Sequence, residues 1–341
     1  MDCSIIVRSL NEADRLRLAL TSLALQTEIS QVVVVDDGST DHTRAVLAEF
    51  ETRLPLKAIH HDRPKGRSPA SNAGAAIADG DILFFLDGDV LLAPQAVAEH
   101  LAIHRRASDA MVRGAQYHLR GTRFLQDPST GAPMAGAEDK IAATSPAELE
   151  RMKVTPAQVC DDFDSIVSRA NTSIYPGAGP AHLYDLEVDA LINHPDCPVL
   201  WAAASGHNFS VPRVAFREAG GFVVDVDQNE HREFALRLSM AGLALRFAEE
   251  AASYHLTHRS GWRDPLRDTV WERAFYRRHP LLSVKLLSVF WAGLNRPCPV
   301  PEAARIADLP QLAEAASGAR GLDYDAVRRR IPGLCDLSDI Q

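Results

Sequence analysis

Cysteine is scarce in this sequence, and its distribution excludes two classes of protein. Five cysteines occur among 341 residues, far apart and without a Cys-x-x-Cys pair. Such spacing fits neither the disulfide framework of a small secreted domain nor a zinc ribbon. The N-terminus, Met1-Asp2-Cys3, also lacks the basic and apolar stretches of a signal peptide. We therefore expect a cytoplasmic protein.

Long apolar runs and an excess of basic residues are absent as well. The sequence has no uninterrupted apolar run long enough to predict a membrane-spanning helix. Its 36 Lys and Arg are outnumbered by 45 Asp and Glu, which gives a net charge of −9. A surface dedicated to nucleic acid needs clustered positive charge, so we expect no nucleic acid partner. An acidic balance suits a protein that holds a divalent cation.

The composition is otherwise that of a globular protein, with 46% hydrophobic residues. The length predicts about two domains, or one large α/β unit with additions. In the N-terminal third, short apolar runs alternate with helical periodicity. Strands are predicted at 4–7, 32–35, 56–60 and 82–86, with helices between them at about 11–24, 45–50 and 70–78. This order predicts a mostly parallel sheet with helices on both faces.

The rest of the chain is less regular. Residues 119–200 carry scattered Gly, Pro, Ser and Asp, which favours an insertion of short helices and loops. Regular patterns return as a strand at 208–211, a helix at 229–241 and a strand at 244–247. From Trp262 onward the pattern is mainly helical and ends in a polar tail.

Two acidic motifs, Asp36-Asp37-Gly38-Ser39 and Asp87-Gly88-Asp89, follow predicted strands. Ligands of open α/β sheets bind at the carboxyl ends of strands, so both motifs are candidate sites. On extended backbone Asp87 and Asp89 project to the same side, where two carboxylates can hold Mg²⁺ or Mn²⁺. The alternative is structural: each motif is a polar turn, and Ser39 or Thr40 caps the next helix.

The order of these motifs resembles that of family 2 glycosyltransferases with the GT-A fold. The matching segments of the first half are 4–12 (SIIVRSLNE), 32–41 (VVVVDDGSTD) and 83–89 (LFFLDGD). Those of the second half are 205–211 (SGHNFSV), 220–222 (GGF), 230–238 (EHREFALRL) and 253–255 (SYH). The resemblance is close over about the first 105 residues and extends to about residue 258, apart from the irregular insertion.

The resemblance implies an α/β fold of the GT-A, Rossmann-like type and a division of labour along the chain. Residues 1–118 would form the donor-binding half and 119–200 an insertion that contacts the acceptor. Residues 201–260 would form the acceptor and catalytic half, and 261–341 a helical C-terminal segment. The donor would be a nucleotide sugar, with a UDP-sugar as the default and GDP or TDP left open. The acceptor would be a saccharide, lipid, peptide or small molecule.

The resemblance also assigns roles to individual residues. Asp37 would recognise the nucleotide base, and Ser9, Asn11 and Glu12 would lie near the nucleotide. Asp87 would lie near the ribose or the metal, and Asp89 would bind a divalent cation, Mn²⁺ or Mg²⁺. His255 would be a third metal ligand. Strand alternation predicts that only one of His255 and His258 points at the site.

Two departures from the family pattern change the candidate residues. The acidic general base of the family is replaced by His231, whose imidazole can take a proton near neutral pH. Glu230 and Glu233 are the rival bases. The Arg that usually precedes Asn72 is missing, so Arg67 or Lys65 would supply the positive charge that meets the diphosphate.

The implied function is metal-dependent glycosyl transfer, most simply with inversion at the anomeric carbon. The alternatives are a sugar-nucleotide nucleotidyltransferase and a non-catalytic nucleotide-sugar binding module. Trp201 would offer a face to a sugar ring or lie in the core. The basic and apolar segment at 273–291 would rest on an anionic membrane surface or pack as an ordinary amphipathic helix.

Overall fold

A computed structural model describes residues 1–341 except 30, 173–182, 227, 259–269 and 341. The chain divides into two compact units. The first comprises Met1–Ile174, Gly206–Phe222 and Ala248–Trp262. The second comprises Tyr175–Ser205, Val223–Phe247 and Arg263–Gln341. The predicted segment boundary near residue 260 lies outside the described residues.

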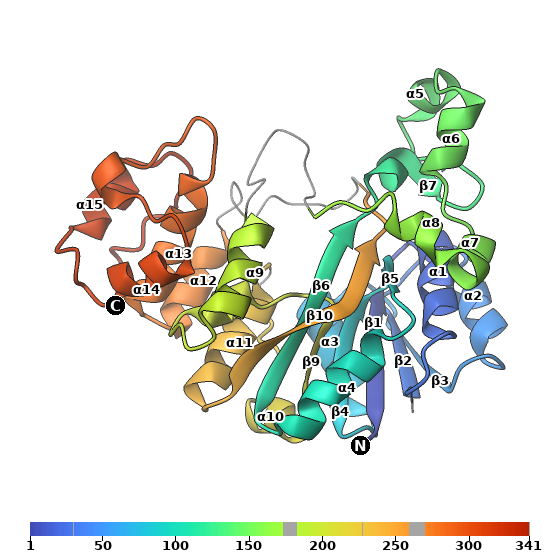
Figure 1. The fold of residues 1–341 in the computed structure, drawn as a ribbon, viewed down its shortest axis with the longest axis horizontal. Helices are drawn as coiled ribbons and strands as arrows, with labels where there is room; N and C mark the ends of the chain where they lie inside the picture. The colour runs from blue at the N-terminus through green and yellow to red at the C-terminus, as the bar shows by residue number, and fades with distance from the viewer. Residues whose placement is uncertain (30, 173–182, 227, 259–269, 341) are drawn as a thin grey trace. The chain divides into compact units, whose positions relative to one another are not determined.

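The first unit contains an eight-stranded sheet of order β3-β2-β1-β4-β9-β6-β10-β5 (Figure 1). Its strands are β1 (Cys3–Ser9), β2 (Gln31–Asp36), β3 (Leu56–His60), β4 (Ile82–Asp87), β5 (Val90–Leu92), β6 (Ala110–His118), β9 (Phe209–Pro212) and β10 (Ala244–His255). The first four strands pair in parallel, whereas β9 runs antiparallel to β4. The predicted α/β fold with a mostly parallel sheet is thus confirmed.

Alternation along the buried strands directs side chains to both faces of the sheet. On one face, Ile5, Val7, Val32 and Val34 share a core with α1 (Ala13–Leu23), α2 (Thr43–Phe50) and α4 (Ala96–Arg106). On the other face, Val33 and Val35 pack with α3 (Arg67–Ala76). Each residue of β2 is buried, as its all-apolar run from Val32 to Val35 leads one to expect of an interior parallel strand. This covered sheet gives the strand ends a rigid base.

The insertion predicted at 119–200 contributes to both units. In the first unit it forms η1 (Arg120–Phe124), the small sheet of β7 (Leu125–Asp127) and β8 (Ala132–Pro133), α5 (Glu138–Ala142), α6 (Pro146–Met152), α7 (Pro156–Asp161) and α8 (Phe163–Val167). These short elements match the predicted mixture of helices and loops. The helix α10 (Arg213–Glu218) follows β9 in the same unit.

The second unit is helical over most of its described length. It contains α9 (Leu183–Asn193), η2 (Leu200–Ala203), α11 (Glu230–Met240), α12 (Trp271–Arg278), α13 (Leu282–Gly293), η3 (Glu302–Ala304), α14 (Leu309–Ala316) and α15 (Tyr324–Arg329). Trp201 is 2% exposed and packs against Phe275, with ring centroids 5.8 Å apart, so it is a core residue and not a sugar platform.

The helix α13 is also part of a core. Its apolar residues from Leu286 to Trp291 are buried, and Lys285 pairs with Asp325 at 2.9 Å. The basic and apolar segment at 273–291 therefore spans two helices, α12 and α13, and the apolar residues of α13 lie in a core with a charged rim. Among the described residues, no helix combines the length and the apolar character needed to cross a membrane.

One strand is longer than the sequence pattern predicts. The pattern indicated separate strands at 244–247 and 253–255, but β10 runs without a break through Ala248-Glu249-Glu250-Ala251-Ala252. These five residues have low intrinsic strand preference. Pairing with β5 at one end and a place beside β6 in the sheet override that preference.

Candidate functional site

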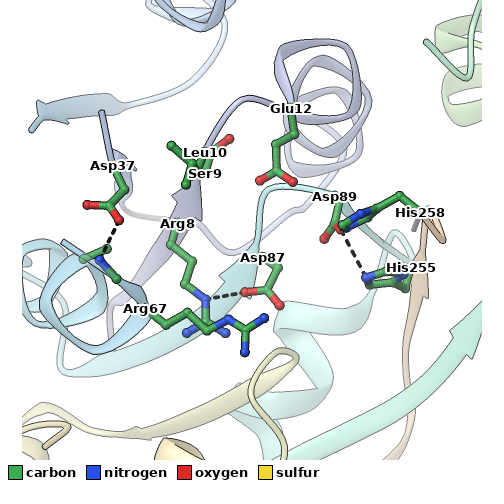
Figure 2. Close-up of a pocket in the computed structure, with 12 residues that line it drawn as sticks. Arg8, Ser9, Leu10, Glu12, Asp37, Arg67, Asp87, Asp89, His255 and His258 are labelled. Atoms are coloured by element: carbon green, nitrogen blue, oxygen red, sulfur yellow. Dashed lines mark hydrogen bonds and ion pairs between the residues drawn. The ribbon is translucent and has the colours of Figure 1, made fainter. Parts of the chain in front are cut away.

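A cavity of about 320 Å³ opens at the carboxyl ends of the parallel strands of the first unit. Its lining comes from the ends of β1, β2, β4 and β10 and from the start of α3 (Figure 2). The predicted site residues in this lining are Ser9, Glu12, Asp37, Arg67, Asp87, Asp89 and His255. Arg8, Leu10, Gly66, Ala70 and His258 complete it. The topology thus brings together polar residues that are distant in sequence.

Asp89 is the centre of a cluster with two histidines. Its Oδ2 lies 3.1 Å from Nε2 of His255 and 2.9 Å from Nε2 of His258 (Figure 2). The other oxygen, Oδ1, is buried and has no hydrogen-bond partner among the described residues. Burial alone would raise the pKa of Asp89, but the two histidines hold it well below its ordinary value. Burial alone would lower the pKa of His255, but Asp89 outweighs burial and raises it.

These three side chains fit a divalent cation. One ligand atom from each of Asp89, His255 and His258 lies within 4.8 Å of the others. Ligand atoms bound to one octahedral cation at about 2.1 Å stand about 3 Å apart. The two nitrogen–oxygen distances of 3.1 and 2.9 Å match that spacing. Carboxylate and imidazole together suit Mn²⁺ and similar transition-metal ions.

The prediction that only one of His255 and His258 points at the site is wrong. Strand alternation would place the two rings on opposite faces, but β10 ends at His255. The chain then leaves the extended geometry, Leu256 N donates to the carbonyl oxygen of Asp89, and both imidazoles reach that carboxylate. The ring centroids of His255 and His258 are 5.8 Å apart and nearly parallel.

Asp87 lies in the same cavity but has different partners. Its Oδ1 accepts a hydrogen bond from Nε of Arg8 at 2.5 Å. Its Oδ2 lies 3.8 Å from Nδ1 of His207, a ring whose pKa burial lowers to about 4. The third member of the metal-compatible cluster is therefore His258, whereas the sequence predicted Asp87.

Gly88 gives Glu12 its place beside the acidic motif. A Cβ at residue 88 would stand 2.6 Å from Oε1 of Glu12 and 3.0 Å from the Ser9 side chain. The absence of a side chain at Gly88 thus leaves room for Glu12 and Ser9. Burial, followed by the charges of Asp89 and Asp87, raises the pKa of Glu12 well above its ordinary value. This carboxyl group binds its proton more tightly than a solvated glutamate does.

Asp37 fastens the loop that leads to α3. Its Oδ1 accepts a hydrogen bond from Nδ1 of His61 at 2.6 Å, and its Oδ2 accepts one from the Gly66 N–H at 2.8 Å. The backbone N–H of Lys65 also donates to this carboxylate. The next residue, Arg67, begins α3 and lines the cavity. Asp37 therefore determines where this arginine enters the site.

Asn11 belongs to the neighbouring loop contacts and is outside the cavity lining. Its Oδ1 accepts a hydrogen bond from the Thr40 N–H at 2.8 Å, and its own N–H donates to Oγ of Ser39. Ser39 and Thr40 therefore join two loops and do not cap the following helix. The residue before α2 is His42, which makes no capping hydrogen bond with its side chain.

The candidate bases lie in the second unit, on the first turn of α11. Nε2 of His231 lies 2.9 Å from Nη1 of the buried Arg232. A guanidinium only donates, so this Nε2 is an acceptor and a neutral His231 carries its proton on Nδ1. Nδ1 lies 3.7 Å from Oε2 of Glu230, which is 3% exposed.

Glu233 is enclosed in a structural ion-pair network. Its side chain is fully buried, and its two oxygens accept hydrogen bonds from Arg237, each at 2.8 Å. His279 lies 2.8 Å from Oε1. Burial alone would raise the pKa of Glu233, but His279 and Arg237 together hold it below its ordinary value. The Glu233 carboxylate thus connects Arg237 of α11 with His279, which directly follows α12.

The site contains residues that the sequence did not single out, chiefly Arg8, His207 and His258. His258 was discarded by the alternation argument, and Arg8 looked like an ordinary strand residue. His207 sits in the segment SGHNFSV, but that pattern did not indicate a contact with Asp87. The sheet order, which places β1, β4 and β9 side by side, brings Arg8 and His207 to Asp87, whereas His258 follows the end of β10.

Comparison with known proteins finds a family that resembles the N-terminal part of the chain. The model of "Glycosyl transferase family 2" matches residues 4–162, which include β1 to β4 and the acidic motifs. This segment of the chain is thus similar to that family. Validoxylamine A glucosyltransferase of Streptomyces hygroscopicus subsp. jinggangensis is 29% identical over 303 residues. That match covers 86% of this chain but only 64% of the relative's length.

Solved structures support the GT-A fold of this chain. S. aureus TarS 1-349 in complex with UDP-GlcNAc has a TM-score of 0.52 at 14% identity, covering 94% of this chain and 92% of that one. The mannosyltransferase PcManGT from Pyrobaculum calidifontis, in complex with GDP-Man and Mn²⁺, has a TM-score of 0.50 at 17% identity. That match covers 94% of this chain and 74% of PcManGT. At these identities the likeness concerns the fold alone.

Proposed function

We propose that this chain transfers a glycosyl group from a nucleoside-diphosphate sugar, first of all a UDP-sugar, to an acceptor with inversion at the anomeric carbon. The observation that carries the proposal is the convergence of Asp89, His255 and His258 on one point of the cavity. The similarity of residues 4–162 to family 2 glycosyltransferases and the position of the cavity at the strand ends support the same reaction.

Asp89, His255 and His258 would hold the divalent cation, Mn²⁺ in the first place. Bound there, the cation neutralises charge on the departing diphosphate. The orphaned Oδ1 of Asp89 supports this role, because a buried carboxylate oxygen without a donor is costly unless a ligand compensates it. Asp89 and the two imidazoles also orient one another before any ligand arrives.

Asp37, Arg67 and the Ser9–Glu12 loop would bind the rest of the nucleotide. Arg67 is exposed, lines the cavity and forms no ion pair with a described residue, so its guanidinium can meet a diphosphate. Lys65 is less suited, because its known contact is through the backbone N–H. TarS and PcManGT were solved with UDP-GlcNAc and GDP-Man, which makes both nucleotides worth testing.

The acceptor would lose its proton to His231 or Glu230. Neither assignment follows from the cavity, since both residues belong to the second unit. The hydrogen bond from Arg232 stabilises the lone pair of Nε2, so His231 must exchange that partner for the acceptor hydroxyl to act as base. Glu230 would act through its carboxylate, whose Oε2 lies 3.7 Å from Nδ1 of His231. Glu233 is the weakest of the three candidates because its carboxylate is bound by Arg237 and His279.

Acceptor specificity would come from the irregular segment at 119–200. Its short elements rise from the same end of β6 that carries His118, and loops on a rigid sheet commonly determine specificity. The class of acceptor, whether saccharide, lipid, peptide or small molecule, is left to experiment.

The proposal is tested by measuring nucleoside diphosphate release from a panel of UDP-, GDP- and TDP-sugars, with Mn²⁺ and with EDTA. Release that depends on Mn²⁺ supports glycosyl transfer. Formation or consumption of pyrophosphate would identify a nucleotidyltransferase. Binding of a nucleotide sugar without turnover would identify a binding module. Asp89→Asn should reduce release more than a thousandfold (about 4 kcal/mol). The matched control is Asp109→Asn, which alters an exposed carboxylate on the α4–β6 loop and should retain full activity.

A further inference from the structure

We propose that Arg8 is a second diphosphate-binding arginine, held in position by Asp87. The inference rests on the proposed use of a nucleoside-diphosphate donor and adds a residue to it. It also gives Asp87, the first carboxylate of the acidic motif, a function that does not depend on metal ligation.

Arg8 is positioned by the register of two parallel strands. Residues 8 and 87 are direct partners in the pairing of β1 with β4. Their side chains meet at the carboxyl edge of the sheet, where Nε of Arg8 donates to Oδ1 of Asp87 at 2.5 Å. The Gly88 N–H donates to the Arg8 carbonyl oxygen at 2.9 Å, so the backbone is fixed at the same point. The strand pairing therefore fixes the backbone of Arg8, and Asp87 holds its guanidinium.

The anchor orients the guanidinium toward the cavity. A guanidinium carries five N–H donors in one plane, and the contact with Asp87 uses the donor at Nε. Arg8 is among the residues that line the cavity, although its side chain is only 14% exposed. The Nη groups extend beyond Nε, and Figure 2 shows the Arg8 and Arg67 side chains reaching into this cavity from different elements. Two planar donors at one site suit the several oxygens of a diphosphate.

The two carboxylates of the acidic motif thus have different partners. Asp89 faces the imidazoles of His255 and His258, whereas Asp87 faces Arg8 and, at 3.8 Å, His207. A carboxylate that accepts a hydrogen bond from Nε limits rotation of the guanidinium, and less conformational entropy is lost when an anion binds. Lysine cannot replace this geometry, because its ammonium is a single point without a planar fork.

The test is the affinity of the metal-free protein for UDP and GDP, and for uridine and guanosine, by isothermal titration calorimetry in EDTA. Arg8→Ala should weaken binding of the preferred diphosphate about ten- to hundredfold, because charge-assisted hydrogen bonds are lost. Binding of the matching nucleoside should change less than threefold. Arg8→Lys should recover only a small part of the loss. Arg17→Ala, which removes a half-buried arginine that pairs with Glu49 and is not among the residues lining the cavity, is the matched control and should bind as the original chain does.

Three outcomes would overturn the inference. Equal losses for diphosphate and nucleoside would show that Arg8 acts only on the structure of the site. Unchanged diphosphate affinity in Arg8→Ala would exclude contact. Failure of the original chain to bind either diphosphate in EDTA would overturn the inference, whereas the proposed function is tested separately by Mn²⁺-dependent release of nucleoside diphosphate. Asp87→Asn, which keeps the size of the side chain, should weaken diphosphate binding less than Arg8→Ala does. A larger effect would assign Asp87 itself to the nucleotide.

Discussion

Two sets of buried charged groups, one in each unit, have different kinds of partner. In the first unit, Oδ1 of Asp89 and Nδ1 of His255 are buried without a hydrogen-bond partner among the described residues. In the second, Arg328 donates to both oxygens of Glu272, and Arg232 donates to Glu187 at 2.8 Å. The first set is arranged around a point that a ligand can occupy. The second set is satisfied by the protein itself.

This difference separates functional from structural polar groups without reference to conservation. A buried polar atom that lacks a partner costs free energy, and a fold retains it where binding returns that energy. In a buried ion pair with complete hydrogen bonds, each charge is compensated by the other. Removal of one partner leaves the other charge buried without compensation and destabilises the fold. The comparison therefore predicts loss of binding in the first unit and loss of stability in the second.

The largest stability effect is expected for Arg328→Met in the second unit. Arg328 is 4% exposed, and its Nη1 also donates to Oγ of Ser288 and to the Lys285 carbonyl oxygen. Its loss leaves Glu272 buried without its cation and should lower the free energy of unfolding by about 4 kcal/mol. Urea denaturation followed by circular dichroism measures this change. Arg329→Met, at the adjacent exposed position, should cost less than about 0.5 kcal/mol, and an equal cost would deny the ion pair its structural role.

His231→Ala is expected to have the next largest effect. It tests a residue of the second unit to which we assign a role in catalysis and not in stability. If the imidazole takes the acceptor proton, transfer should fall about a hundredfold, while the affinity for nucleoside diphosphate stays the same. Initial rates with a saturating donor and calorimetric titration measure the two properties. Unchanged turnover would move the base to Glu230, for which Glu230→Gln is the corresponding variant. A loss of nucleotide affinity would contradict a role confined to the acceptor.

The smallest effect concerns two buried histidines of the first unit that contact Ser210 of β9. His100 and His104 share Oγ of Ser210, at 2.7 and 2.8 Å, and burial lowers their pKa values to about 3 and about 4. Between these values and the ordinary pKa near 6.5, only the unfolded chain binds the protons, so stability falls as the pH falls. We expect a loss of about 1 kcal/mol from pH 7 to pH 6.

The pH effect is measured by urea denaturation at the two pH values. His104→Gln should reduce the pH-dependent loss by about half, because one of the two titrating groups is gone. An equal loss of unfolding free energy between pH 7 and pH 6 in His104→Gln would mean that other groups determine the pH dependence of stability. A rise in stability toward pH 6 would contradict the sign of both shifts.

The parallel half of the sheet was predictable because local and tertiary preferences agree there. Val32 to Val35 favour strands by their branched side chains and are also buried on both faces, and Asp and Gly mark their end. The same agreement fixed β1, β3 and β4 to within a few residues. The acidic motifs at these ends followed directly, since parallel strands deliver their carboxyl ends to one edge of the sheet.

The rest depended on contacts that a linear pattern does not contain. The alternation rule for His255 and His258 assumed that the strand continued, but its end is determined by pairing with β5, which the sequence did not indicate. Arg8 was hidden because a strand residue reveals its partner only when the register with β4 is known. The roles of Glu233 and Trp201 were open for a similar reason, since His279 and Phe275 are remote in sequence.

The central claim is that Asp89, His255 and His258 form one cation site, and Mn²⁺ binding tests it most directly. The free Mn²⁺ signal in an EPR titration gives the stoichiometry and affinity without any need for a substrate. We predict that the original protein and Asp109→Asn each bind one Mn²⁺ per chain. The affinity for Mn²⁺ should be at least tenfold weaker in His258→Ala, and Asp89→Asn should not bind Mn²⁺ at this site. Equal Mn²⁺ binding by the original protein and Asp89→Asn would contradict this claim.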